Sequence, residues 1–174
     1  MSEIFKGVLI GDEKFQQTMD GITRFAKRPR LAMRDMSAVL EEQTEENFKD
    51  QGRPKWKPLS EITIRARLGG DKAHTKKGKL RKQAKRELEQ MKILQVRGLL
   101  AGSVHSQYGD DYSMIGAATP YARIHQLGGM AGRNLKVEIP ARPYLPFSKD
   151  LKLQPEARNQ LLKTGMKHLQ RAAN

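Results

Sequence analysis

Cysteine is absent from this chain of 174 residues, which excludes disulfide bonds and thiolate metal sites. Aromatic residues make up only 6% of the chain, and its longest apolar runs extend over only a few residues. A membrane-spanning helix needs about 20 consecutive apolar residues, so no membrane association is expected. A secretory signal is also missing from the N-terminus. We therefore expect a protein made in a cytosol, and either used there or carried in an assembly built there.

Basic residues dominate what is present. The chain has 33 Lys and Arg against 19 Asp and Glu, a formal net charge of +14, and 37% of its residues are apolar. The length and apolar content predict a single domain over residues 1–174 with a modest core. The excess charge favours an acidic partner, such as nucleic acid, an anionic membrane or an acidic protein surface.

The N-terminal half is predicted to be mostly helical. A short apolar run over residues 5–10 predicts a strand, and Asp12 suits the N-cap of a helix reaching residue 27. Pro29 breaks this helix, and apolar residues at helical spacing predict a second one over residues 31–49. The two helices form either an antiparallel hairpin or one long kinked helix. Ser60 then suits the N-cap of a short helix over residues 61–68.

The C-terminal half is predicted to hold the strands. Residues 104–108 and 112–116 alternate between apolar and polar around a Gly-Asp-Asp turn, which predicts a β-hairpin. Residues 130–134 are predicted to be a flexible link, and 136–139 another strand. A final helix covers about residues 155–172, with a predicted buried stripe of Ala157, Leu161, Leu162, Met166 and Leu169. The fold class is therefore α+β: a helical N-terminal half, a small antiparallel sheet with a hairpin, and a C-terminal helix.

Most of the positive charge lies between Arg65 and Arg97, where twelve Lys and Arg residues face three acidic ones, a net of +9. Residues 69–79 are predicted to be a mobile basic insertion, and residues 79–95 a helix. Base readout is not expected, because the chain has neither a zinc-finger pattern nor an aromatic-rich motif. We predict contact with DNA phosphates in a lumen, or with an acidic partner, through Lys76, Lys77, Lys79, Arg81, Lys82, Lys85 and Arg86.

Catalytic and metal-site patterns are missing. No His pair has metal-ligand spacing, and Glu41, Glu42, Glu45 and Glu46 are interpreted as a solvated acidic helix face rather than a divalent-ion site. His125 could serve as a general base, but no motif pairs it with a nucleophile. We therefore expect no enzyme, no cofactor and no metal. His125 itself is interpreted as a polar residue whose hydrogen bonds are satisfied by neighbouring backbone.

Several short motifs occur together and in order. They are Arg-Pro-Lys-Trp-Lys-Pro-Leu-Ser at 53–60, Leu-Leu-Ala-Gly-Ser at 99–103, Tyr-Ala-Arg-Ile-His-Gln-Leu-Gly-Gly at 121–129, and Ala-Arg-Pro-Tyr-Leu at 141–145. With them, residues 31–150 resemble the virion morphogenesis or tail completion family of tailed bacteriophages, whose members are G-like proteins of Mu and S-like proteins of P2-like phages. The first helix and the basic stretch lie outside the best-matching motifs.

The resemblance implies an α+β structural protein without catalytic activity. It implies assembly in the host cytoplasm and a place in the virion at the head–tail junction, as a ring of copies, six by analogy with tail symmetry. The expected partners are further copies, neighbouring connector and tail proteins, and packaged DNA passing through the lumen. The alternative is a basic nucleic-acid-binding module that contacts phosphates. The predicted interface or core anchors are Trp56, Tyr121, His125, Arg142 and Tyr144.

Overall fold

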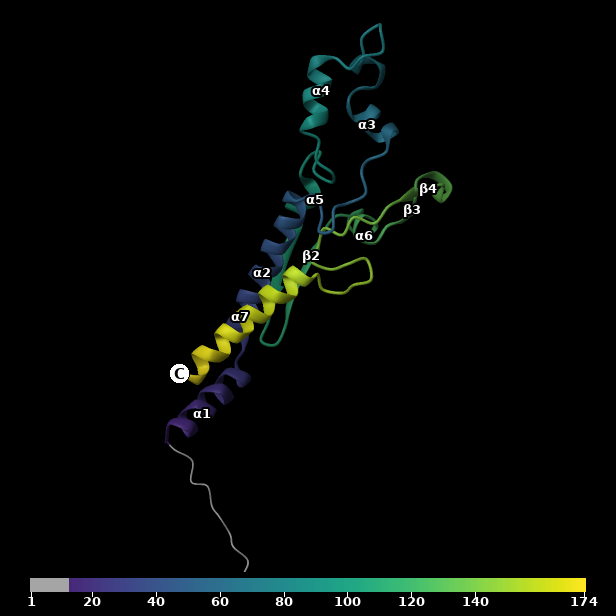
Figure 1. Ribbon diagram of the computed structural model, residues 1–174. Coiled ribbons are helices and arrows are strands. Elements are labelled where there is room, and N and C mark those ends of the chain that lie inside the picture. The colour runs from purple at the N-terminus through teal and green to yellow at the C-terminus, as the bar shows by residue number, and fades with distance from the viewer. Residues whose placement is uncertain (1–12) are drawn as a thin grey trace, which may run out of the picture.

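The computed structural model describes residues 13–174, which form an elongated α+β molecule (Figure 1). We name three parts of it. The helical end is residues 13–49 with 155–174, the arm is residues 61–89, and the joint is the region around the core of Phe48, Trp56 and Tyr144 that connects them. The predicted strand at residues 5–10 and the predicted cap at Asp12 lie outside the described residues. The two ends of the described chain lie together at the helical end, where Glu13, Lys14, Gln17 and Thr18 line a pocket with Ala173 and Asn174. Among residues 13–174, no helix is both long and apolar enough to cross a membrane.

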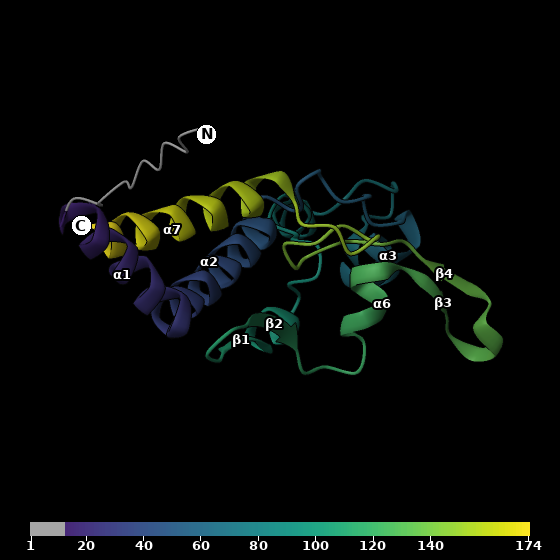
Figure 2. The ribbon, with the colours of Figure 1, turned by 90° about the horizontal axis from the view of Figure 1, so that it is seen from below.

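The helical end consists of α1 (Glu13–Lys27), α2 (Arg30–Lys49) and α7 (Pro155–Ala173). Pro29 separates α1 from α2, as predicted, but both helices have α7 as their main helical partner (Figure 2). The Thr18 hydroxyl donates a hydrogen bond to the Ala173 carbonyl at 3.0 Å, and Gly21 lies directly against the Ala172 carbonyl. The predicted hairpin of the first two helices and the single kinked helix are therefore both wrong, because the last helix lies between them in the packing.

The buried face of α7 differs from the predicted stripe. Ala157 is buried and Leu161 is partly buried, but Leu162, Met166 and Leu169 are exposed. Gly165 faces the Met36 side chain instead, and His168 forms a 2.9 Å contact between its Nε2 and the Asp35 Oδ2. Small residues allow helices to approach closely, so they, rather than the larger apolar residues, set which side of α7 is covered.

The predicted hairpin is confirmed as β1 (Val104–Tyr108) and β2 (Ser113–Ala117), with Val104 opposite Ala117. One face of it packs on α2. A second antiparallel pair joins β3 (Gly129–Ala131) to β4 (Val137–Ile139) through the short 3-10 helix η2 (Arg133–Leu135). The prediction of a flexible link over residues 130–134 is therefore wrong at the start of that range, where β3 lies. The structure also has two separate two-stranded sheets where a single small sheet was predicted. Because β3 is only three residues long and is held by backbone pairing, its sequence shows no alternation of buried and exposed residues that would predict a strand.

The joint contains the main apolar core. It is formed by Phe48 at the end of α2, Trp56, Leu100 in α5 (Leu99–Gly102), Ala122 in α6 (Ala122–Leu127), and Tyr144. The Phe48 ring meets the Trp56 ring edge-on at 5.9 Å and lies 5.6 Å from the Tyr144 ring. Such aromatic contacts add to the stabilisation that burial itself provides.

The arm has a second, smaller core. It comprises α3 (Glu61–Arg67), a 3-10 helix η1 (Gly70–Ala73) and α4 (Lys82–Glu89), which enclose Leu68, Ala73 and Ala84. The predicted Ser60 cap is confirmed, since its hydroxyl accepts the Thr63 N–H at 3.3 Å. The segment predicted to be mobile, residues 69–79, contains η1 and one side of a bridge between His74 and Leu80. Its mobility stays a prediction.

The helix predicted over residues 79–95 is shorter than expected, because α4 ends at Glu89. After α4 the chain returns to the joint: the Ile93 N–H donates to Gln51 Oε1 at 2.6 Å, and the Gln95 amide donates to the Phe48 carbonyl at 2.7 Å. These contacts come from residues more than 40 positions away, and they outweigh the helical periodicity of the segment.

Candidate functional site

The predicted anchors gather at the joint. Trp56 is buried, and its indole N–H donates to the Pro143 carbonyl at 2.9 Å. Tyr144 is also buried and donates from its hydroxyl to the Ala122 carbonyl at 3.4 Å; burial raises the pKa of Tyr144 to about 12. Both aromatic residues therefore serve the core of this subunit rather than a free surface.

Arg142 holds two separate segments together. Its guanidinium donates to the carbonyls of Lys57 and Pro58 at 3.0 and 3.2 Å, while its backbone N–H donates to the His125 carbonyl at 2.7 Å. Burial lowers the pKa of Arg142, and the charge of Arg67 adds to this effect. The Ala-Arg-Pro-Tyr-Leu motif is thus explained by its contacts with the Pro-Lys-Trp-Lys-Pro loop.

A network of buried amides, which the sequence analysis missed, completes the joint. The Asn47 amide donates to the carbonyl of Tyr144 and to Gln154 Oε1 at 3.1 and 2.9 Å, while its oxygen accepts the Arg53 Nε–H at 2.9 Å. Gln126 Oε1 accepts the backbone N–H groups of Tyr144 and Leu145, each at 3.0 Å. The available signal was a run of polar residues beside the buried stripe of α2, at Gln43, Thr44 and Asn47.

His125 differs from its predicted state. Its Nδ1 is buried and has no hydrogen-bond partner within residues 13–174, so the expected satisfaction by neighbouring backbone is wrong. The Tyr121 ring meets the imidazole edge-on at 5.9 Å, and Tyr121 itself remains partly exposed. Burial, and then the charge of Arg142, lowers the pKa of His125. The imidazole is therefore neutral at neutral pH.

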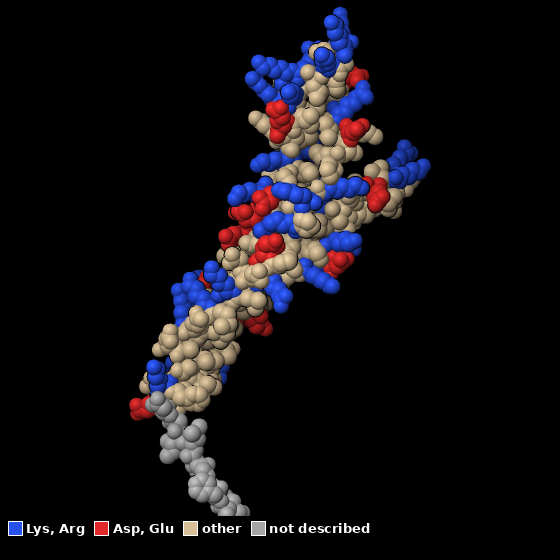
Figure 3. All heavy atoms as spheres, viewed as in Figure 1, with Lys and Arg blue, Asp and Glu red and all other residues tan. Residues whose placement is uncertain are grey.

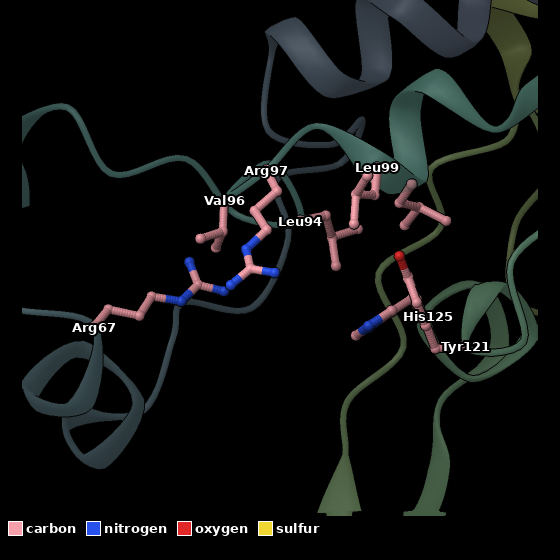
Figure 4. Close-up of a pocket in the computed structure, with 8 residues that line it drawn as sticks. Arg67, Leu94, Val96, Arg97, Leu99, Tyr121 and His125 are labelled. Atoms are coloured by element: carbon pink, nitrogen blue, oxygen red, sulfur yellow. The ribbon is translucent and has the colours of Figure 1, made fainter.

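A pocket of about 250 Å³ lies beside this imidazole (Figure 4). Arg67 of α3 and Arg97 of the segment before α5 extend toward one another, with His125 and Tyr121 across from them. The remaining wall is apolar and comes from Leu94, Val96, Leu99 and Leu100. A neighbouring pocket of about 550 Å³ shares Arg67 and His125 and reaches Arg142. Among the described residues, none that lines the smaller pocket is acidic, so this pocket offers two cations and an apolar wall to an anion.

The basic residues predicted to meet DNA or an acidic partner all lie on the arm, away from the joint. All seven are exposed, and Figure 3 shows Lys and Arg side chains surrounding this part of the molecule. None of them forms an ion pair within the part of the chain that the structure describes. On α4, the Lys82, Lys85 and Arg86 side chains are exposed while Ala84 is buried against the arm's own core. The structure therefore places a free cationic surface there.

Metal-ligating side chains do not cluster in the part of the chain that the structure describes. Residues 13–174 contain no set of three His, Asp or Glu side chains that could hold a metal ion. The His125 Nδ1, the atom that a general base would use, has no hydrogen-bond partner within residues 13–174.

Comparison with known proteins identifies the chain's relatives. The model of the phage virion morphogenesis family matches residues 10–169. The chain belongs to this family. The resemblance predicted from the motifs at 53–60, 121–129 and 141–145 is thereby confirmed, and with it a role in phage virion assembly. The family is not one of known enzymes.

Individual relatives come from Mu-like phages. The chain is 34% identical over 113 residues to Mu-like prophage FluMu G protein 2 of Haemophilus influenzae, covering 65% of this chain and 62% of that protein. It is 34% identical over 143 residues to FluMu G protein 1 of the same organism, covering 79% and 76%. The putative capsid assembly protein G of Escherichia phage Mu is 47% identical over 60 residues, covering 33% and 37%. The chain thus spans less than two thirds of the first of these relatives, and no solved structure matches it.

Proposed function

We propose that this chain is a tail-completion subunit that assembles as a ring at the head–tail junction and helps to join head to tail. Its partners are then further copies of itself and the neighbouring connector and tail proteins, and six copies would match tail symmetry. Membership of the virion morphogenesis family gives the assembly role. The position in the particle and the ring are the steps that we add.

The amount of exposed surface carries the proposal. The accessible surface is 13624 Å² for a chain of 19.7 kDa, whereas a compact monomer of that mass exposes about 8,600 Å². Even a fully extended segment of twelve residues exposes only about 1,900 Å², so residues 1–12 do not account for the excess. A subunit that leaves this much surface uncovered is suited to an assembly in which neighbours cover it.

The apolar part of this surface lies on more than one face. Leu162 and Met166 are exposed on α7, Met114 is exposed on β2, and Leu135 and Val137 are exposed around the η2 turn. Large exposed apolar patches mark interaction sites. Exposed apolar side chains on several elements support several neighbours per subunit, as in a closed ring with additional contacts above and below it.

Electron microscopy of particles tests the proposal directly. Particles assembled with a labelled chain should show the label as a ring where head meets tail. Particles made without the chain should yield full heads and separate tails that lack the ring and stay unjoined. A label distributed along the tail tube or inside the head shell would contradict the proposed position.

The free cations of the arm favour a second candidate function, which is phosphate contact with DNA. The chain would then bind duplex DNA without sequence preference, and its affinity would fall steeply with salt. Charge reversal at Lys76, Lys77, Lys82, Lys85 and Arg86 should impair DNA retention or assembly. Infectious particles of normal yield from that variant would exclude both DNA contact and docking on an acidic neighbour as roles of the arm.

A further inference from the structure

The pocket beside His125 holds two positive charges, and none of the described residues that line it is acidic. The Arg67 guanidinium makes only a long 3.4 Å hydrogen bond to the Lys92 carbonyl, and Arg97 makes no ion pair within residues 13–174. The two side chains extend toward one another (Figure 4), although like charges repel. An anion between them would relieve this repulsion, and a carboxylate can accept hydrogen bonds from guanidinium groups in a bidentate manner.

The rest of the pocket restricts the kind of anion. Leu94, Leu99 and Leu100 form an apolar wall, which disfavours a fully hydrated ion and suits a carboxylate carried on an aliphatic stem. Burial and the charge of Arg142 keep the neighbouring His125 imidazole neutral. The two arginines therefore supply the positive charge of the pocket, and an acidic side chain from another polypeptide fits both its charge and its wall.

The same chain carries a surface of the matching sign. Four glutamates lie within six residues of α2, and Figure 3 shows acidic side chains gathered over that helix. Glu41 accepts the Ser106 N–H at 3.0 Å and Glu46 pairs with Lys49, but Glu42 and Glu45 are exposed and make no ion pair within the described residues. Residues three apart on a helix have Cβ atoms about 5–6 Å apart, so both carboxylates can approach one partner site.

The two surfaces belong to different elements of the molecule. The acidic residues lie on α2, whereas the pocket lies between α3, the segment before α5, and α6. A contact between two unlike patches of identical subunits is heterologous. Such contacts generate a ring when the rotation that relates one subunit to the next closes on itself. The charge complementarity therefore points to a second copy of this chain as the occupant of the pocket.

We infer that the Arg67–Arg97 pocket of each subunit receives Glu42 and Glu45 of the α2 helix of a neighbouring copy, and that this contact joins the subunits of the ring. The inference rests on the proposed ring and names one of its interfaces. Desolvated charge pairs across an interface make their largest contribution to the dissociation rate and fix the register of the contact.

A charge-exchange experiment on the full chain tests this contact. The oligomeric state of four proteins is measured by analytical ultracentrifugation and native mass spectrometry. They are the wild type, Arg67→Glu/Arg97→Glu, Glu42→Lys/Glu45→Lys, and the control Lys82→Glu/Lys85→Glu. The control changes the net charge as much as the double substitution of Arg67 and Arg97 does. Either of the first two variants should raise the subunit dissociation constant at least about 30-fold, since breaking one side of a paired charge contact has effects of this size. The control should assemble as the wild type does.

Mixing the two variants gives the sharper result. In an equimolar mixture the reversed pocket of one variant meets the reversed helix of the other, and the two unchanged surfaces also meet. Alternating rings should therefore form from two proteins that each fail to assemble alone. Circular dichroism and thermal melting of each variant show whether its fold is intact.

The outcomes separate this inference from the proposed function. Wild-type rings that persist in both reversed variants, or a mixture that stays dissociated although both variants are folded, would overturn the inference and leave the ring in place. A wild type that remains monomeric at millimolar concentration would overturn both. Assembly lost only in the Lys82→Glu/Lys85→Glu control would move the interface to the arm. Normal rings from the pocket variant with loss of duplex DNA binding would assign the pocket to phosphate.

Discussion

The side-chain amide of Asn47 donates a hydrogen bond to the main-chain oxygen of Tyr144 at 3.1 Å, across 97 residues of sequence. Both residues are essentially inaccessible to solvent, with relative exposures of 0% and 1%. The bond fixes the end of α2 to the Arg-Pro-Tyr-Leu segment. It is the central contact of a joint from which the helical end and the arm extend in different directions.

Replacing Asn47 by Ala should destabilise the protein by about 3 kcal/mol. The substitution removes a hydrogen-bond partner from the Tyr144 carbonyl, the Leu145 carbonyl and the Arg53 guanidinium. Buried polar groups that lose their partners reduce the free energy of unfolding. Urea denaturation should show a lower midpoint with an unchanged slope. The exposed Asn159→Ala on α7 is the matched control and should shift the free energy by less than about 0.5 kcal/mol. Equal effects at both positions would contradict the proposed importance of the network.

Gly128→Ala should also destabilise the fold, by at least about 2 kcal/mol. Gly128 ends α6 with φ at 76°, and a Cβ there would lie 2.8 Å from the Ala141 nitrogen. Gly102→Ala, in a helix with open space around it, should be neutral or slightly stabilising because Ala favours helix. Thermal unfolding of the pair measures the difference. A stable Gly128→Ala protein would show that β3 can separate from the Pro140-Ala141 segment without loss.

Stability should fall as the pH drops below the ordinary histidine range, and His125 should contribute to this fall. Its pKa in the folded protein is lowered from 6.5 by burial and by Arg142, so the unfolded chain binds a proton there before the folded chain does. The unfolding free energy then decreases from about pH 6.5 down to the folded pKa and levels off below it.

His125→Gln should flatten this part of the pH profile, as followed by urea midpoints between pH 7.5 and 5. His105→Gln, at an exposed position on β1, is the control and should leave the slope unchanged. A parallel slope in the His125→Gln variant would mean that another group governs the acid response.

Ala84→Asp should unfold the arm and leave the joint intact. Ala84 is 5% exposed and packs with Leu68 and Ala73 in a core separate from that of Trp56, and burying an unpaired carboxylate is costly. Hydrogen exchange should lose its protection in α3 and α4, while the fluorescence transition of Trp56 keeps its midpoint. Gln83→Asp makes the same charge change at an exposed site and should keep the arm protected. Loss of both transitions together would show one cooperative unit.

The elements that depend on local sequence could be predicted. The Ser60 cap, the Pro29 break and the Gly-Asp-Asp turn are each determined by residues within a few positions. The α+β class and the virion morphogenesis family followed from these elements and from the order of the motifs.

The remaining features depend on residues that are distant in sequence. The end of α4 is set by Gln51 and Phe48 holding residues 93–95 at the joint, and no periodicity reveals such a contact. The covered side of α7 is set by Gly21 and Gly165 allowing close approach, whereas the prediction weighted the larger Leu and Met residues. The arginine pocket combines Arg67, Arg97 and His125 from three segments, and only the fold brings them together.

The packing of α1 on α7 bears on how the protein is made. Thr18 and Gly21 find their contacts at Ala172 and Ala173, so the helix that leaves the ribosome early meets its main partner some 150 residues later. Domains can otherwise begin to fold as soon as their N-terminal parts are synthesised. The helical end can therefore be completed only once α7 has been translated, whereas the arm has all of its core residues within 64–91 and can form earlier.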